Sequence, residues 1–173
     1  MSVGTLVTIV LLVGVLILGI FLIQKIFSGS TDAIDSINNE VTNQINDLFS
    51  RDGDQRISVA PPSREIKLKQ GDDPKGFAFS VRNTGVESAD FSYTVEVDDI
   101  SNCGSTMTED IANSYILGGT GSFSLGPGDK LSLPRLVRFD LPESAPPCTV
   151  IYNLNVKKGN VPYDTAQVFV TIK

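Results

Sequence analysis

Histidine and tryptophan are both missing from the 173 residues of the chain, and cysteine occurs only twice. Histidine is the usual general base near neutral pH and the commonest metal ligand, so its absence removes the residue best suited to either role. The sequence also lacks a nucleophile motif, a phosphate-binding loop and a spaced calcium loop. We therefore expect a protein that is not an enzyme, with no catalytic residues, no cofactor and no metal ion.

Positive charge is scarce as well. The chain has 14 lysines and arginines against 20 acids, which gives a formal net charge of −6 and a pI near 4.6. A protein that binds nucleic acid needs a basic surface to neutralise phosphates. We therefore exclude nucleic acid as a partner.

Charge of either sign is absent between Val3 and Ile23, a run of apolar residues broken only by threonine and glycine. As a helix this run would be about 32 Å long, close to the thickness of the hydrocarbon core of a bilayer. It lacks the preceding basic residues and the small-residue cleavage site of a secretory signal peptide. We predict a retained membrane segment. Lys25 on its C-terminal side would place the rest of the chain in the cytoplasm, unless a short basic leader has been removed.

Apolar residues continue beyond this run at helical spacing. Phe27, Ile34, Ile37, Val41, Ile45 and Leu48 follow one another in steps of 7, 3, 4, 4 and 3. Two interpretations are open: this stripe packs on the chain's own β-domain, or it packs on neighbouring copies. We favour the second and predict one helical region, residues 1–50. The filament-core residues predicted on it are Leu6, Ile9, Val10, Val13, Leu16, Ile20, Ile23, Phe27, Ile34, Ile37, Val41, Ile45 and Leu48.

A weak point is expected within this helix at Ser28, Gly29 and Ser30. Glycine is disfavoured in a helix by about 1 kcal/mol relative to alanine, and Ser30 can cap a second helix. A kink is therefore predicted at these three residues.

Residues 51–55 read as a short polar linker, and from Arg56 onward the apolar period changes to two. Half-buried strands are predicted where apolar and polar residues alternate. Turn signals such as Asn83-Thr84-Gly85 separate these strands, and no helical pattern interrupts them. The irregular segment between Ser101 and Gly121 is expected to form a long loop. The predicted fold class is α+β, with a long N-terminal hydrophobic helix followed by an immunoglobulin-like β-sandwich at residues 56–173. Its strands are centred on Ile66–Leu68, Phe77–Val81, Phe91–Val97, Phe123–Leu125, Leu131–Leu133, Val137–Leu141, Val150–Val156 and Val168–Ile172.

The two cysteines, Cys103 and Cys148, both lie in this second part. In a β-rich domain behind a membrane segment they are typical of one disulfide in an oxidising compartment. Two buried free thiols in a reducing compartment are the alternative. A disulfide would close a loop of about 46 residues, which is worth roughly 4 kcal/mol by chain entropy.

With these elements in place, the chain resembles the type IV pilin-like superfamily, above all archaeal pilins and archaellins. The residues that carry the resemblance are SVGTLVTIVLLVGVLILGIFLI at 2–23 with its extension to Phe49, and stretches such as Phe79–Gly85 and Leu125–Asp129 in the β-domain. Bacterial type IV pilins carry a glutamate at the fifth mature residue, where this chain has Thr5. The departure is compatible with an archaeal filament and counts against a bacterial pilus.

The resemblance implies a structural subunit of an extracellular filament that polymerises through its N-terminal helix. Its implied partners are identical subunits, the membrane before assembly, and a pilus assembly machinery. The alternative function is a single-pass membrane-anchored surface protein whose immunoglobulin-like domain binds a partner. In that case residues 3–23 alone would be anchored, and the stripe from Ile34 to Leu48 would form a stalk or a self-packed helix.

Overall fold

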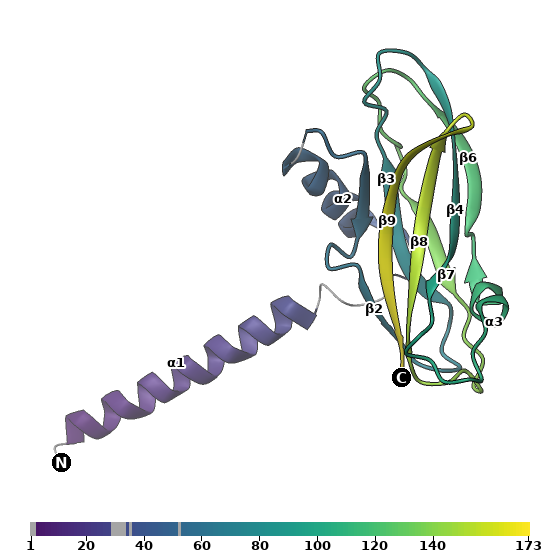
Figure 1. The fold of residues 1–173 in the computed structure, drawn as a ribbon. Helices are drawn as coiled ribbons and strands as arrows, with labels where there is room; N and C mark the ends of the chain where they lie inside the picture. The colour runs from purple at the N-terminus through teal and green to yellow at the C-terminus, as the bar shows by residue number, and fades with distance from the viewer. Residues whose placement is uncertain (1–2, 29–33, 35, 52) are drawn as a thin grey trace.

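Two β-sheets stacked face to face form the body of the protein (Figure 1). The computed structural model describes residues 3–28, 34, 36–51 and 53–173; the side chains of residues 3, 6, 9 and 21–28 lie outside this description. One sheet has four strands in the order β1-β3-β7-β5, and the other has five in the order β2-β9-β8-β4-β6. All pairs are antiparallel except β2 with β9. The predicted β-sandwich is confirmed.

The helices are α1 (Val3–Ser28), α2 (Asn39–Arg51) and α3 (Glu109–Ser114). The strands are β1 (Ile57–Ala60), β2 (Glu65–Leu68), β3 (Lys75–Val81), β4 (Ala89–Asp99), β5 (Ile116–Leu117), β6 (Thr120–Leu125), β7 (Arg135–Phe139), β8 (Thr149–Lys158) and β9 (Val161–Ile172).

The core lies between the sheets and is rich in aromatic rings. Strand alternation directs one residue in two inward, and Phe77, Phe79, Phe139 and Tyr152 are all at most 1% exposed. Phe79 meets Tyr93 from the opposite sheet with ring centroids 4.8 Å apart. Phe139 and Tyr152 meet across the core at the same distance. These contacts between rings join the two sheets.

Helix α2 packs on the outer face of the four-stranded sheet. Asn38 begins it, since its Oδ1 accepts a hydrogen bond from the Val41 N–H at 2.9 Å, as an N-cap does. The strand residues beneath the helix are small, Ala60 and Ala78 among them, so the helix can approach closely. Val41, Ile45 and Phe49 fill this contact.

The α+β class predicted from the sequence is wrong. In the part of the chain that the structure describes, strands are more extensive than helices, so the protein is mostly β. No single long apolar helix occupies residues 1–50: α1 ends at Ser28, α2 begins at Asn39, and Ile34 between them forms a β-bridge with Gly76. The apolar spacing is helical on both sides of residue 34, but two backbone hydrogen bonds to Gly76, of 2.8 and 2.7 Å, hold Ile34 at the sheet edge.

The segment from Ser101 to Gly121 differs from the loop that was expected. It contains α3 and β5 and the start of β6. Thr108 caps α3 by accepting a hydrogen bond from the Ile111 N–H. Conversely, the strand expected at Leu131–Leu133 is absent, and Leu133 is 69% exposed.

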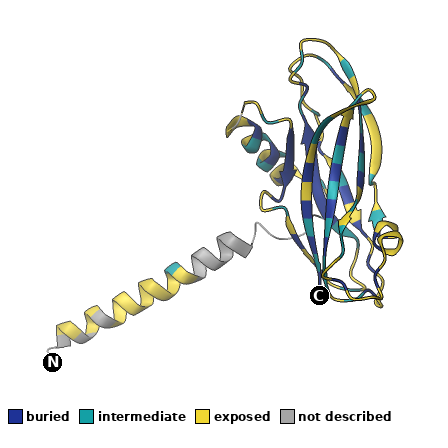
Figure 2. Ribbon diagram, in the orientation of Figure 1, coloured by how far each residue is buried: buried dark blue, intermediate teal, exposed yellow. Residues whose placement is uncertain are grey.

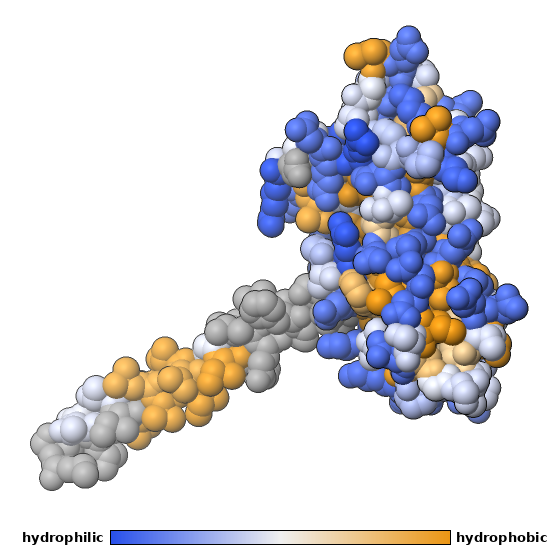
Figure 3. Space-filling view, in the orientation of Figure 1, coloured by the Kyte–Doolittle hydropathy of each residue, from blue (hydrophilic) through white to orange (hydrophobic). Residues whose placement is uncertain are grey.

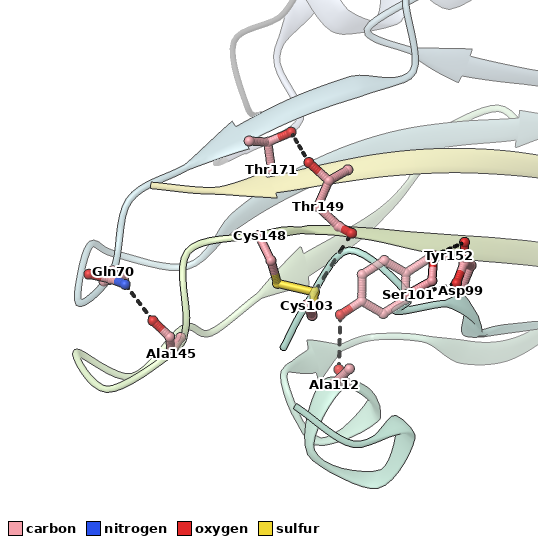
Figure 4. The surroundings of a disulfide bond; sticks show 10 residues. All are labelled: Gln70, Asp99, Ser101, Cys103, Ala112, Ala145, Cys148, Thr149, Tyr152 and Thr171. Atoms are coloured by element: carbon pink, nitrogen blue, oxygen red, sulfur yellow. Dashed lines mark hydrogen bonds between the residues drawn. A yellow bond between two sulfur atoms is a disulfide. The ribbon is translucent and has the colours of Figure 1, made fainter. Parts of the chain in front are cut away.

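The predicted disulfide is present. Cys103 and Cys148 are bonded, with a sequence separation of 45. Around the bond, the Tyr152 hydroxyl donates to the Ala112 carbonyl of α3, and Gln70 donates to the Ala145 carbonyl (Figure 4). The bond thus ties the start of the α3 segment to β8.

Candidate functional site

Helix α1 exposes an apolar surface on every side that the structure describes. Its exposed large side chains range from 49% exposed at Ile20 to 66% at Val15. They include the consecutive residues from Val10 to Val13 and from Val15 to Leu18, so no single face is spared. Figure 2 shows the described part of this helix almost wholly as exposed, and Figure 3 shows it as the main hydrophobic surface in that view. A helix that is hydrophobic all round is normally buried.

Local sequence explains why these residues form a helix without tertiary support. Leucine has a high helix propensity, and the run contains no proline. Thr8, one of the few polar residues, donates its hydroxyl hydrogen bond back to the Gly4 carbonyl at 2.9 Å. Gly14 and Gly19 are not required by crowding, since a Cβ added to either would meet nothing within 4 Å. They leave shallow points at which another helix can approach.

Four of the predicted filament-core residues on this helix are described and exposed: Val10, Val13, Leu16 and Ile20. Four others, Leu6, Ile9, Ile23 and Phe27, have side chains outside the described set. Of the predicted kink, Ser28 is the last residue of α1, and Gly29 and Ser30 lie outside the described residues. The membrane segment predicted between Val3 and Ile23 is not confirmed: among the residues searched, no helix is both long and apolar enough to cross a membrane.

The second half of the predicted stripe packs within the chain. Val41 and Ile45 are buried on the face of α2 that contacts the sheet, and Ile34 and Ile37 pack partly buried against the same cluster. This is the first of the two interpretations that the sequence left open. Leu48 is only half-buried, and Phe49, which the sequence analysis did not select, is 1% exposed. The four-residue steps from Val41 to Ile45 to Phe49 were the signal for it.

Two cations hold Phe49 and the end of α2 in place. The Arg82 guanidinium lies 4.7 Å from the centroid of the Phe49 ring, and the Lys130 ammonium lies 5.7 Å from it. Arg82 also donates to the Gly53 carbonyl at 2.8 Å and to the Phe49 carbonyl at 3.5 Å, so it caps the C-terminal end of α2. The apolar face of α2 is therefore already covered by the sheet, whereas the described large side chains of α1 are left exposed.

The pKa shifts of two titratable groups, Tyr152 and Asp99, are explained by burial and by local hydrogen bonds. Burial raises the pKa of Tyr152, whose hydroxyl donates to the Ala112 carbonyl at 3.0 Å. Hydrogen bonds from the Ser101 N–H and hydroxyl hold the pKa of Asp99 below its usual range. Among the described residues, no group of three or more cysteine, aspartate or glutamate side chains is placed to hold a metal ion.

The exposed surface of α1 is thus the candidate functional site, and its chemistry is apolar association. Comparison of the sequence with protein-family models and with curated proteins finds no match.

Proposed function

We propose that the chain is a structural subunit of an extracellular filament and that it polymerises through α1. The observation that carries the proposal is the apolar surface of this helix, whose described large side chains between Val7 and Ile20 are each about half or more exposed. Packing against the same helix in neighbouring copies would cover that surface on several sides at once. A partner that offered a single groove would leave the other faces in water.

The size of the driving force supports this reading. Complete burial of a valine, leucine or isoleucine side chain is worth about 1.5–3 kcal/mol. The described part of α1 has large apolar side chains along its length, each roughly half to two-thirds exposed. Their burial would contribute on the order of 10 kcal/mol per subunit relative to water. A short helix with few apolar residues would contribute less than this. Each copy added to the filament would contribute the same burial free energy again.

The rest of the chain suits the outside of such a filament. The sandwich has its own buried core, so it does not depend on neighbours to fold. The Cys103–Cys148 disulfide is typical of a protein outside the reducing cytosol. The pilin-like architecture that the sequence resembles uses an apolar N-terminal helix for the core and a β-rich part for the surface. Identical subunits and an assembly machinery would then be the partners.

The test compares two leucine-to-aspartate variants of the full chain. Leu16 in α1 and Leu133 in the β6–β7 connection are 63% and 69% exposed, so neither change should disturb the fold of one subunit. After removal of a mild detergent, the wild type and Leu133→Asp should form thin filaments in negative-stain electron microscopy. Leu16→Asp should not, because an unpaired carboxylate would enter the packed helices.

Filaments of Leu16→Asp at wild-type yield would overturn the proposal. So would a wild-type chain that floats with phosphatidylcholine vesicles as a monomer and forms no filament under any condition that leaves the sandwich folded.

A further inference from the structure

The sandwich carries a hollow of about 370 Å³ beside β2, with an apolar floor and a basic rim. Leu68, Phe139 and Leu141 line its floor. Lys67, Lys69, Lys75 and Lys173 stand around it, and Asp72 and Asp73 are its acidic members. Four lysines against two aspartates make this lysine-rimmed hollow locally positive in a chain whose net charge is −6.

A knob of matching chemistry projects from the opposite edge of the sandwich. Helix α3 begins with Glu109, Asp110 and Ile111, all three exposed, and Ile111 is 40% exposed. This acidic knob therefore presents one partly exposed apolar residue directly after two exposed acidic residues. The hollow offers the reverse, an apolar floor flanked by ammonium groups.

The knob is held rigidly. Ala112, directly behind it, is fully buried, and its carbonyl accepts the Tyr152 hydroxyl at 3.0 Å. Asn113 Oδ1 accepts the Val97 N–H of β4 at 3.0 Å. The disulfide at Cys103 anchors the chain before the helix. A rigid knob loses little conformational entropy when it is covered.

One copy cannot place its own knob in its own hollow. Strand β2 is one edge of the five-stranded sheet, and β9 and β8 separate it from β4, on which α3 rests. Three strand spacings of about 4.8 Å separate β2 from β4. Figure 1 shows β2 and α3 on opposite sides of the sandwich. In the described part of the chain, no salt bridge joins a lysine of the rim to an acid of the knob.

We propose that the lysine-rimmed hollow of one copy receives the acidic knob of the next copy of this chain. The contact is heterologous, because two different surfaces meet, so each added copy leaves one free knob and one free hollow. Such a contact builds a helical filament when the rotation between successive copies does not close into a ring. The inference rests on the proposed function and adds a lateral contact between the outer parts of the subunits.

Zero-length cross-linking tests the contact directly in the full chain. Isotope-labelled and unlabelled chains are mixed, assembled, and treated with a carbodiimide, which joins an amine to a carboxylate in contact. Mass spectrometry should find peptides of mixed isotope composition in which Lys67, Lys69 or Lys75 is joined to Glu109 or Asp110. Filaments without such peptides, if their formation still depends on Leu16, would overturn this inference and leave the proposed function intact.

Charge reversal gives a second test with matched controls. Lys67→Glu should raise the concentration needed for assembly by about threefold or more, since attraction across the rim becomes repulsion. Lys157→Glu, which makes the same charge change on β8 away from the hollow, should not. Glu109→Lys in the knob should likewise raise the concentration needed for assembly, and its control Glu87→Lys should not.

Mixing the two reversed chains provides the decisive case. In an equimolar mixture, the reversed knob of one chain can meet the reversed hollow of the other. The mixture should therefore assemble at a lower total concentration than either variant alone. Equal effects of Lys67→Glu and Lys157→Glu, with no rescue on mixing, would contradict the contact. If the wild type forms no filament at all, the proposed function itself fails.

Discussion

Replacement of Phe49 by alanine tests whether α2 belongs to the folded subunit or to the contacts between subunits. The side chain is 1% exposed and packs among Val41, Ile45 and the small residues of β1 and β3. Truncation of a buried phenylalanine to alanine costs about 3–5 kcal/mol. The loss of the cation–π contacts with Arg82 and Lys130 adds roughly 0.5–1 kcal/mol at a partly exposed site.

Because the cluster beneath α2 is small, we expect the lower end of this range, about 3 kcal/mol. For a chain of this size, each kcal/mol shifts the Tm by about 2–4 °C, so Phe49→Ala should lower it by roughly 6–12 °C. The assay is urea and thermal unfolding of the full chain, kept monomeric in a mild detergent and followed by circular dichroism. Leu48→Ala, at the half-buried neighbouring position, is the control and should cost less than about 1 kcal/mol.

A monomer of Phe49→Ala with unchanged stability would refute this reasoning. It would mean that α2 leaves the sheet in the single subunit and that its apolar stripe is free to pack on neighbouring copies.

Two further predictions concern the sandwich alone. Reduction of the Cys103–Cys148 disulfide should lower the Tm by about 10 °C, since the bond closes a loop whose chain entropy is worth roughly 4 kcal/mol. The same reductant should leave the Tm of a Cys103→Ser/Cys148→Ser variant unchanged. A wild-type Tm that does not change on reduction would contradict the bridge. Tyr152 should make stability depend on pH in alkali. Burial raises its pKa in the folded state, so its neutral form stabilises the fold below about pH 10 and this contribution is lost as the pH rises further. Tyr152→Phe should lose about 1 kcal/mol at pH 8 with the hydrogen bond to Ala112, yet decline less steeply above pH 10; parallel curves for the two proteins would count against this account.

The sandwich could be predicted from the sequence because its strands obey a simple rule. In β3, Phe77, Phe79 and Val81 alternate with small residues, and all three face the core between the sheets. The rule failed at one segment that alternates like a strand but does not form one. Leu131 and Leu133 alternate with polar residues, but Pro134 follows them and Leu133 points to solvent.

The helical region was harder to predict because periodicity does not reveal what a stripe packs against. Val41 and Ile45 would look the same in either environment. The missing information lay in β3, where Ala78 packs beneath α2 and Gly76 pairs with Ile34. A Cβ at Gly76 would lie 1.9 Å from the Val137 carbonyl oxygen, so this glycine marks a close approach of backbones. That pattern was visible in the sequence, but its partner was not.

The candidate site, the apolar surface of α1, was the easiest feature to find in the sequence. Its role depends on the other molecules that cover it. An uncharged run from Val3 to Ile23 is evident in the sequence, and its described side chains are exposed on all sides of the helix. The knob, by contrast, lies in a segment that the sequence presented as a loop, and the hollow draws its apolar residues from two predicted strands, Ile66–Leu68 and Val137–Leu141. Their opposite placement follows from the strand order, which no local pattern encodes.

The central claim is that α1 forms the core of a filament, and helical reconstruction from electron micrographs of filaments made by the full chain tests it most directly. The account predicts a central bundle of helices in which Val10, Val13 and Leu16 contact neighbouring copies, surrounded by the β-sandwiches. Filaments held together by the sandwiches alone, with α1 absent from the axis, would contradict it.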